Sequence, residues 1–465
     1  MMSNTRTREG EKICFDVIVV GAGLAGSTAA AIAARGGLKV ALVERGQNPG
    51  GKNFFGGAVY THALEEIYPD FWDRKPPLER PVTEAGFWFL SQDGLSKMTV
   101  QGGKLKRPSS TNGNGGQTSA SANPGPTSDA YVALRARFAS WLAEQAQKEG
   151  ALIIPKTTVL DFMHEPGGRV IGVKTDRPQG DIYAPITIVC EGVNNLLTQK
   201  LGLIKHDLKP STVALGVKQL ISLPTETINA RFGLADQNHG LAVSVMGDVS
   251  MGLTGLGFVY TGNECVSVGL GVNLDLLAEN HLRPYDLLQR YLNHPAIAPL
   301  IAGGKLMEYG AHLIPEGGWR QMPRLFTDGV MVAGDAATMV NALHWEGTNM
   351  AIIAGKAAGE TAVQAHTMRD YSAATLSLYR DNLKNRFVLQ DLYQYRNLSN
   401  FLEHHPQFMD VYPAFLNDAL GMFFSGFGVP KKTLYRDILR SFTSRRPLIQ
   451  AVGDMVSFGK SVMGW

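Results

Sequence analysis

Residues 15–45 read FDVIVVGAGLAGSTAAAIAARGGLKVALVER, and this stretch decides the fold. The apolar run 17–20 is rich in β-branched residues, which predicts a buried strand. A run of small residues, which predicts a helix, follows three glycines in the order G-x-G-x-x-G: Gly21, Gly23 and Gly26. In dinucleotide-binding units the first glycine permits the turn, the second lets backbone approach a pyrophosphate, and the third lets helix and strand pack closely. The phosphate then lies at the helix N-terminus.

A second apolar strand, predicted over 38–43, ends in Glu44. This carboxylate follows the glycines by about 20 residues, the spacing at which an acid binds the ribose hydroxyls of a dinucleotide. An acid there favours a ribose without a phosphate. The glycine pattern alone is a weak signal, since any glycine-rich turn can imitate it. Together with the flanking strand, the helix and Glu44, it predicts a dinucleotide site.

The choice between FAD and NAD depends on a segment near the other end of the chain. An apolar strand predicted over 330–333 runs into Gly334 and Asp335. An acid at the end of a strand can bond the ribityl chain of a flavin, which NAD lacks; the alternative is that Asp335 only caps a turn. Residues 346–349 (EGTN) then open a second small-residue helix, whose N-terminal N–H groups would favour the negative charge of a reduced flavin ring. We therefore predict FAD.

Three further segments supply candidate FAD contacts. The glycine-dense loop 50–57 contains Lys52, which either lies near the cofactor or belongs to a plain surface loop. Arg135, near the start of an amphipathic helix predicted over 131–151, either meets the pyrophosphate or is a solvated charge. A third turn, around Gly192, follows another predicted strand. The predicted FAD contacts are Gly21, Gly23, Ala25, Gly26, Glu44, Arg45, Lys52, Asn53, Gly57, Arg135, Gly192, Gly334, Asp335, Gly347, Thr348 and Asn349.

Composition narrows the class of protein. The 465 residues, 44% hydrophobic and 18% charged, suffice for two or three domains with their own cores. A net charge of +3 is no nucleic-acid signature. Three scattered cysteines, Cys14, Cys190 and Cys265, give neither a disulfide framework nor the four thiolates of an iron–sulfur cluster, and no metal site is predicted. We recognise no secretory signal and no transmembrane helix, so we expect a cytoplasmic protein.

The chain is predicted to be an α/β protein with a Rossmann-type FAD-binding domain, a mixed β-sheet substrate domain and a helical C-terminal region. Alternating residues over 82–101 predict a hairpin that turns at Asp93-Gly94. Residues 102–128 are almost wholly small and polar, which predicts a flexible loop. The predicted boundaries are 12–101, 129–209 and 321–370 for the parts of the FAD-binding domain, 102–128 for the loop, 210–320 for the substrate domain and 371–465 for the helical region.

The helical region carries apolar stripes around residues 434–442 and 448–456. Beside them lie one acid, Asp437, and six cations: Lys431, Lys432, Arg436, Arg440, Arg445 and Arg446. Basic amphipathic helices bind anionic membrane surfaces, each cation contributing about 1 kcal/mol. The alternative is a helix pair that packs on its own domain with solvated charges. The pattern alone does not separate the two.

The longer motifs resemble a known family. They are similar to the flavoprotein subunit of electron-transfer-flavoprotein:quinone oxidoreductases of the Fix type (FixC-like), within the geranylgeranyl-reductase and p-hydroxybenzoate-hydroxylase-like superfamily. The segments that carry the resemblance are Gly51-Lys52-Asn53, Gly257-Phe258-Val259-Tyr260-Thr261 and, above all, 341–349 (NALHWEGTN). The likeness covers residues 14 to about 440. The glycine motif and Asp335 are shared across the superfamily, so they indicate only FAD and a fold of the glutathione-reductase/p-hydroxybenzoate-hydroxylase kind.

The resemblance implies an FAD-dependent oxidoreductase that takes electrons from the alpha and beta subunits of an electron-transfer flavoprotein. The electrons would pass to a quinone, with the protein peripheral on the inner face of the cell membrane. Single-chain members carry a cysteine-rich ferredoxin-like end, and its absence here implies a separate small ferredoxin-like iron–sulfur subunit. His344 and Glu346, next to the expected ring edge, are candidates for passing protons to the quinone; the alternative is a structural pair. In two departures from the family, Glu191-Gly192 replaces the usual Asp-Gly, and 102–128 has no counterpart.

Three rival interpretations stay open. A prenyl reductase of the same fold would share nearly every FAD residue, although the run 344–349 argues against it. A flavin monooxygenase would oxidise NADPH rapidly with oxygen uptake. A non-catalytic FAD-binding scaffold would hold a flavin that never changes its redox state.

Overall fold

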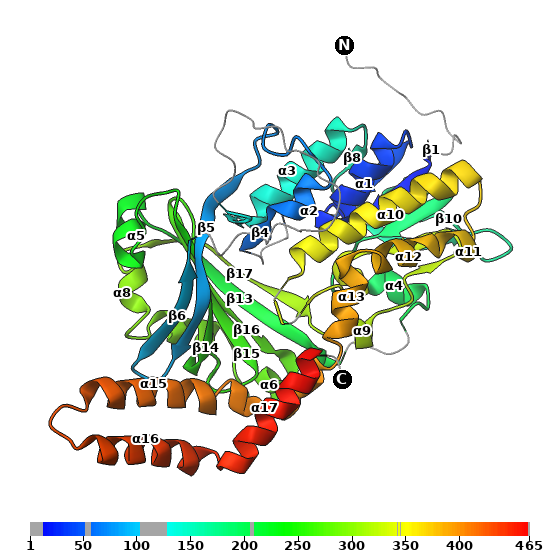
Figure 1. Cartoon of the computed structure of the whole chain (residues 1–465). Helices are drawn as coiled ribbons and strands as arrows, with labels where there is room; N and C mark the ends of the chain where they lie inside the picture. The colour runs from blue at the N-terminus through cyan, green and yellow to red at the C-terminus, as the bar shows by residue number, and fades with distance from the viewer. Residues whose placement is uncertain are drawn as a thin grey trace, which may run out of the picture. The chain divides into compact units, whose positions relative to one another are not determined.

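The computed structural model describes residues 13–51, 57–102, 128–204, 209–341, 343–344 and 346–463 (Figure 1). The chain forms two compact units, each assembled from three separate stretches. The first unit comprises residues 1–53, 136–207 and 317–393, and the second comprises residues 54–135, 208–316 and 394–465. The loop predicted over 102–128, apart from its two end residues, lies outside the described residues. The domain boundaries given by the sequence stay a prediction.

The first unit is built on a largely parallel sheet. In spatial order its strands are β18 (Phe326–Thr327), β19 (Val330–Val332), β12 (Ile186–Val189), β2 (Val17–Val20), β3 (Val40–Val43) and β8 (Leu152–Ile154). Neighbouring strands are parallel except β18 with β19. Every residue of β2, β3, β12 and β19 is buried, as expected for strands covered on both faces. The strands predicted over 17–20, 38–43 and 330–333 are confirmed, with their ends shifted by at most two residues.

Two helices of small residues pack against each other in the first unit. These are α1 (Leu24–Arg35), which follows the glycine turn, and α10 (Thr348–Met368). A Cβ atom on Gly355 would lie 2.2 Å from the carbonyl oxygen of Ala25, so only glycine permits the backbones to approach this closely. The close approach explains why both helices are rich in alanine and glycine.

A smaller sheet and several helices complete the first unit. Two of the helices named below, α3 and α13, each have one end residue, Arg135 and Gln394, in the second unit. The smaller sheet has the order β1 (Ile13–Cys14), β11 (Ile182–Tyr183), β10 (Val170–Thr175) and β9 (Val159–His164). The other helices are α3 (Arg135–Lys148), α4 (Leu196–Lys200), α9 (Gly318–Gln321), the short η4 (Gly334–Ala337), α11 (Ala373–Leu376), α12 (Leu378–Lys384) and α13 (Phe387–Gln394).

The second unit is built on a larger, mixed sheet. Its spatial order is β17 (Lys305–Pro315), β13 (Val213–Ser222), β16 (Cys265–Asn273), β15 (Gly255–Thr261), β14 (Gly240–Gly247), β5 (Leu78–Leu90), β7 (Ala130–Ala133) and β4 (Ala58–Tyr60), and β6 (Leu95–Gln101) pairs with β5. Neighbouring strands are antiparallel except β14 with β5. The predicted mixed sheet and the hairpin that turns at Asp93-Gly94 are both confirmed.

One face of this sheet is covered by an apolar core. Val217 of β13, Val259 of β15 and Val268 of β16 pack there with residues of α5 (Thr225–Phe232) and α7 (Pro284–Leu292). The remaining short elements of this part are α2 (Thr61–Glu65), η2 (Pro210–Thr212), η3 (Asp248–Ser250), α6 (Leu274–Glu279) and α8 (Ala298–Ile301).

The C-terminal part of the second unit is helical, as predicted. Its elements are α14 (Leu398–His404), η5 (Pro406–Phe408), α15 (Val411–Ser425), α16 (Lys431–Arg445) and α17 (Leu448–Met463). Helices α15 and α16 form a hairpin, drawn in orange and red in Figure 1, and Asn417 Nδ2 of α15 donates to the carbonyl oxygen of Phe89 in β5 at 2.7 Å. None of the helices that the structure describes is both long and apolar enough to cross a bilayer.

The helix predicted over 131–151 begins later in the structure than the sequence pattern indicates. Residues 130–133 form β7, and the helix begins at Arg135. In β7, Tyr131 pairs with Val59 on one side and with Pro81 on the other. Hydrogen bonding in a sheet is a tertiary effect, which a local helical pattern cannot reveal.

Candidate functional site

The predicted cofactor residues of the first unit follow the carboxyl ends of neighbouring parallel strands. Gly21 comes directly after β2, Glu44 directly after β3, and Gly192 and Gly334 soon after β12 and β19. Because these strands run side by side in the same direction, their carboxyl ends lie at one edge of the sheet. Ligands of open parallel sheets bind at this edge. The structure therefore brings four of the predicted turns together.

The glycine turn has the geometry of a pyrophosphate site. Gly21 has a φ of +99°, and a Cβ there would lie 2.4 Å from the carbonyl oxygen of Cys190. A Cβ on Gly26 would lie 1.8 Å from the carbonyl oxygen of Gly21. Gly23 is the N-cap of α1, and Ala25 lies in its first turn. The first N–H groups of a helix have no partner within the helix, so they suit a phosphate.

Glu44 is oriented by the turn beside it. Its Oε2 accepts the backbone N–H of Ala22 at 2.9 Å, and its Oε1 accepts that of Gly46 at 2.6 Å. A carboxylate oxygen has a second lone pair, so both atoms can still accept a ribose hydroxyl. The position matches the role that the sequence predicts for Glu44.

The turn after β12 is connected to the turn after β19. Glu191 accepts the backbone N–H groups of Leu197 and Thr198 at 2.8 and 2.7 Å, so its carboxylate caps α4. With its amide turned to donate, Asn195 reaches the carbonyl oxygens of Gly192 and Ala336, each at 3.0 Å. The sequence patterns did not reveal this connection. The available signal was the asparagine itself, because asparagine is enriched among residues with positive φ. Asn195 has a φ of 52°.

Asp335 lies in η4, next to a close contact with the glycine helix. Gly334, with a φ of +72°, would bring a Cβ to 3.0 Å from the Cβ of Ala25. Asp335 is half-buried in this turn. A larger residue before Asp335 would push the turn away from α1, so glycine keeps this acid near the G-x-G-x-x-G motif.

The segment before α10 forms a tight turn held by Asn341. The backbones of Asn341 and Glu346 bond to each other twice, at 3.1 Å, and the Asn341 side-chain oxygen accepts the N–H groups of Leu343 and His344 at 3.0 and 3.3 Å. Gly347 is the N-cap of α10, and Thr348 is its first residue. His344 is exposed at the surface of this turn.

Two buried amide atoms beside this turn point to a ligand. Asn341 Nδ2 and Asn349 Oδ1 have no hydrogen-bond partner among the described residues, although both residues are at most 1% exposed. Buried polar atoms in proteins are nearly always paired. A flavin ring carries both carbonyl acceptors and an N–H donor at its pyrimidine edge, so the residues present fit this group.

Glu346 belongs to a cluster of titratable groups. Its Oε1 accepts Asn349 Nδ2 at 2.9 Å. Burial raises the pKa of Glu346, the hydrogen bond from Asn349 opposes this, and the nearby Asp391 carboxylate adds to it. Burial also raises the pKa of Asp391, against the effect of His344. The structure therefore brings the predicted pair together and adds Asp391 of α13, which no sequence motif indicated.

For the other predicted FAD contacts, the structure gives only a surface position or the unit to which the residue belongs. Arg45 follows Glu44 and is exposed. Lys52 and Asn53 lie outside the described residues. Gly57 and Arg135 belong to the second unit. The contact of each of these residues with FAD stays a prediction.

The fold and the site define an FAD-dependent oxidoreductase. Residues 16–198 match the model of the FAD-dependent oxidoreductases. Residues 213–314 match the ubiquinone-binding part of ETF-QO, the electron-transfer-flavoprotein:quinone oxidoreductase, and residues 398–463 match the C-terminal domain of the ETF-QO/FixC family. The chain belongs to this ETF-QO/FixC family, and its cofactor is FAD.

Curated relatives match over nearly the whole chain. Protein FixC of Azorhizobium caulinodans is 39% identical over 452 residues, which cover 96% of this chain and 98% of the relative. Protein FixC of Azotobacter vinelandii is 38% identical over 96% of this chain and 99% of its own length. Protein FixC of Escherichia coli strain K12 is 40% identical over 86% of this chain and 88% of its own length.

Solved structures share the fold. A geranylgeranyl bacteriochlorophyll reductase-like protein from Thermoplasma acidophilum superimposes with a TM-score of 0.68 at 22% identity, covering 96% of this chain and all of the other. A flavin-dependent brominase superimposes with a TM-score of 0.59 at 15% identity, covering 93% of this chain and all of the other. At such identities the likeness concerns the fold alone, and it confirms the predicted glutathione-reductase/p-hydroxybenzoate-hydroxylase kind.

We predict that replacing Asp335 with alanine weakens FAD retention. Losing a hydrogen bond to a charged group costs about 1.5 to 3 kcal/mol, which is roughly a tenfold or larger rise in the dissociation constant. The measurement is titration of the apoprotein with FAD, together with the flavin-to-protein absorbance ratio after purification. Asp328→Ala is the matched control, because Asp328 precedes β19 at its opposite end and should leave FAD affinity unchanged. Full occupancy in Asp335→Ala would remove the ribityl assignment.

Proposed function

We propose that this protein passes electrons from an electron-transfer flavoprotein, through a separate ferredoxin-like iron–sulfur subunit, to a membrane quinone. The observation that carries this proposal is the order of three matches in one chain: an FAD-dependent oxidoreductase part, a ubiquinone-binding part and the C-terminal domain of the ETF-QO/FixC family. Bound FAD exchanges electrons singly or in pairs, which suits transfer from one-electron carriers to a two-electron acceptor.

The residues of the first unit would hold and tune the cofactor in this reaction. The N-terminus of α1 and the glycine turn would bind the pyrophosphate, Glu44 the ribose, and Asp335 the ribityl chain. The N-terminus of α10, with Asn349, would hold the pyrimidine edge, because the positive end of a helix favours a negatively charged ring. Burial raises the pKa of both Glu346 and Asp391, which favours their protonated forms.

The proposal places the iron–sulfur cluster on a separate subunit because the cysteines of this chain do not suit one. The chain has three cysteines, fewer than the four thiolates of an all-cysteine cluster. Cys190 belongs to the first unit and Cys265 to the second, and both are buried. Burial raises the pKa of Cys190, which keeps its thiol protonated and a poor metal ligand.

The proposed place of action is the membrane surface, and α17 supports it. On this helix the polar side chains Asp454 and Ser461 are buried, whereas the apolar Ile449 and Val452 are 88% and 64% exposed. A helix that packs on its own domain buries its apolar face. Helix α17 packs through Phe458, which contacts Phe401 and Phe408, but it leaves Ile449 and Val452 exposed. The polar face is held by Asp454, which accepts hydrogen bonds from Gln407, Tyr412 and Arg446 at 2.5 to 2.8 Å.

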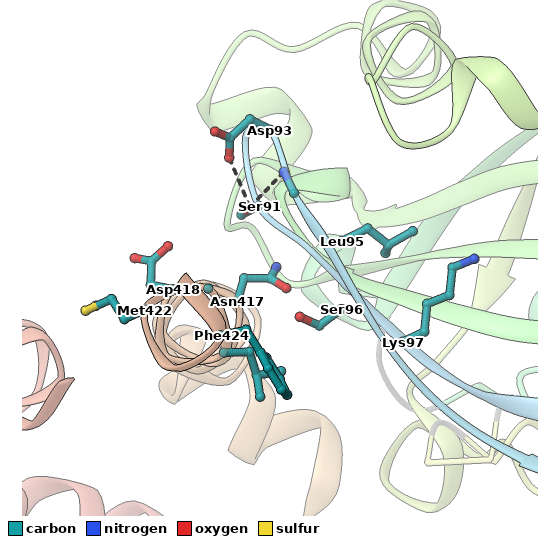
Figure 2. Close-up of a pocket in the computed structure, with 12 residues that line it drawn as sticks. Ser91, Asp93, Leu95, Ser96, Lys97, Asn417, Asp418, Met422 and Phe424 are labelled. Atoms are coloured by element: carbon teal, nitrogen blue, oxygen red, sulfur yellow. Dashed lines mark hydrogen bonds between the residues drawn. The ribbon is translucent and has the colours of Figure 1, made fainter. Parts of the chain in front are cut away.

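The end of the α15–α16 hairpin exposes further apolar side chains. Phe424 and Phe427 are 67% and 85% exposed. Phe424 also lines a groove of about 680 Å³ between α15 and the β5–β6 hairpin, where Leu95 and Lys97 lie opposite (Figure 2). Aromatic and aliphatic side chains at such positions suit the boundary between lipid head groups and acyl chains.

The structure changes the count of cations available to lipid. Arg445 pairs with Asp418, and Arg446 forms two hydrogen bonds with Asp454. Arg436 lies 3.7 Å from Asp437, and Lys431 Nζ donates to the carbonyl oxygen of Gly426 at 2.8 Å. Of the six cations, Lys432 and Arg440 are the two with no such pairing among the described residues. The apolar side chains therefore carry more of the proposed membrane contact than the charges do.

We predict that the double variant Phe427→Ser, Ile449→Ser binds membranes much less tightly. Burying one large apolar side chain contributes about 1.5 to 3 kcal/mol, so losing two lowers partitioning by at least about tenfold. Co-sedimentation with vesicles that contain anionic lipid measures this. Leu196→Ser is the control, because Leu196 of α4 is 62% exposed but lies in the other unit. Equal sedimentation of all three proteins would contradict the proposed surface.

Purification of the untagged partner proteins with this chain tests the proposed function. We expect both electron-transfer flavoprotein subunits and a small iron–sulfur protein to copurify with it. The absorption spectrum should combine flavin and iron–sulfur bands. Purification of the FAD-loaded chain alone, with no effect of these partners on its redox state, would contradict the proposal.

A further inference from the structure

The sheet of the second unit has two unlike faces. Val217, Val259 and Val268 face the apolar core, which side chains fill. Strand alternation places their neighbours on the opposite face, among them Lys218 and Phe258. Because side chains fill the core face, a ligand of this sheet would have to contact the face that carries Lys218.

Lys218 is a buried lysine in the middle of this face. It is 3% exposed, which is unusual because lysine is almost never fully buried. Its cross-strand neighbours are two glycines, Gly269 on β16 and Gly310 on β17. A Cβ on Gly269 would lie 2.5 Å from the Lys218 Cβ and 2.4 Å from the Phe258 Cζ. The lysine stem and the phenyl ring therefore both lie over Gly269, in space that a side chain at this position would fill.

Two stacked aromatic rings continue from this point. The rings of Phe258 and Tyr260 have centroids 4.9 Å apart and an interplanar angle of 17°. A Cβ on Gly57 would lie 2.0 Å from Tyr260 Cδ2, so this glycine makes room for the second ring. A quinone head group is a flat ring with two carbonyl acceptors. It needs an aromatic surface and a hydrogen-bond donor, and this face supplies both.

We propose that Lys218 is a catalytic residue that donates a hydrogen bond, and then a proton, to a carbonyl oxygen of the quinone, whose ring packs against Phe258 and Tyr260. This inference rests on the proposed function, because it assigns the subsite and the proton donor for the same acceptor. It concerns residues within 213–314, the part matched by the ubiquinone-binding model.

The proton and electron balance closes with one lysine. A quinone takes up two electrons and two protons to become a quinol. Reduced FAD would supply both electrons and one proton, and the Lys218 ammonium would supply the second proton. The resulting amine regains its proton from solvent, so each turnover consumes one solvent proton.

The surroundings of Lys218 suit proton donation. Burial lowers the pKa of Lys218 to about 8; Glu308 of β17 and Cys265 of β16 oppose this shift, and Arg135 adds to it. His312 shares this face of β17 by strand alternation with Gly310. A general acid works best when its pKa lies near the working pH. The ammonium is present below pH 8 and is lost as the pH rises through that value.

The test uses the FAD-loaded protein, reduced chemically without oxygen and mixed with a short-tailed quinone. Stopped-flow absorbance follows flavin reoxidation as a function of quinone concentration and pH. We expect the wild-type limiting rate to fall above about pH 8 and the rate for Lys218→Met to be at least about a hundredfold lower at pH 7. Lys218→Arg should bind quinone about as tightly as the wild type. Its limiting rate of flavin reoxidation should not fall above about pH 8, because arginine stays protonated there. Lys305→Met, at an exposed position of β17, should behave as wild type.

A second readout does not depend on turnover. Quinone quenching of tyrosine and tryptophan fluorescence in the oxidised protein should give a dissociation constant about tenfold higher for Lys218→Met, because one hydrogen bond to a charged group is lost. Wild-type rates and affinity in Lys218→Met, or a pH-independent wild-type rate between about pH 7 and pH 9, would overturn the assignment of Lys218. Failure of quinone to reoxidise even the wild-type protein would instead overturn the proposed function.

Discussion

Replacing Gly26 with alanine should give a protein that purifies without FAD. The new Cβ would lie 1.8 Å from the carbonyl oxygen of Gly21, so the turn and the start of α1 must move apart. Such overpacking costs about 1 to 3 kcal/mol of stability, and the displaced N–H groups no longer converge on a phosphate. The flavin-to-protein absorbance ratio and titration of the apoprotein with FAD measure the loss. We expect the affinity for FAD to fall by at least about a hundredfold, since two or more phosphate hydrogen bonds are lost.

Gly453→Ala is the matched control for this variant. Gly453 lies inside α17, and a Cβ there would meet nothing within 4 Å. Alanine favours helix by about 1 kcal/mol over glycine, so this variant should keep its FAD and gain slightly in stability. A yellow Gly26→Ala protein with wild-type affinity would show that the turn does not form the pyrophosphate site.

Replacing Arg80 with methionine should destabilise the second unit by about 3 to 5 kcal/mol. Arg80 is fully buried, and its guanidinium donates to the carbonyl oxygens of Gly262 and His239 at 2.6 and 3.0 Å and to Asn229 Oδ1 at 2.6 Å. It also reaches the carbonyl oxygen of Asp236 at 3.1 Å. Methionine fills a similar volume but leaves these buried acceptors without a donor. Urea denaturation, followed by far-ultraviolet circular dichroism, measures the change in unfolding free energy.

An exposed arginine provides the comparison for Arg80. The side chain of Arg283 is 80% exposed and pairs with Asp286 on the surface. Exposed ion pairs contribute between about 0 and 1 kcal/mol, so Arg283→Met should unfold close to the wild-type midpoint. If both variants lost the same small amount of stability, the buried network around Arg80 would not hold this part of the sheet.

The sequence predicted most of the first unit because its signals are local. The turn at Gly21, the acid at Glu44 and the strand before Gly334 each follow from a short pattern with a fixed spacing. Each of these patterns lies where a parallel strand ends, so locating the strands also located the turns. The FAD prediction and the family resemblance are confirmed by the match to FAD-dependent oxidoreductases and by the FixC relatives.

Other features depend on contacts that a sequence pattern does not contain. Residues 131–133 were predicted as part of a helix, but they pair with two strands and belong to β7. Lys218 lies in a strand-like stretch of the sequence, and only the structure shows that this residue is 3% exposed. In α17 the apolar stripe was predicted, yet its exposure depends on how Asp454 anchors the opposite face. Long-range pairing and burial decided all three.

The most direct test of the account follows the FAD spectrum of the purified complex through one electron-transfer cycle without oxygen. Reduced electron-transfer flavoprotein should bleach the flavin of this chain in the presence of the iron–sulfur subunit, and adding quinone should restore its colour. A flavin that stays oxidised with the reduced donor, or stays reduced when quinone is added, would contradict the central claim that this chain carries electrons between the two.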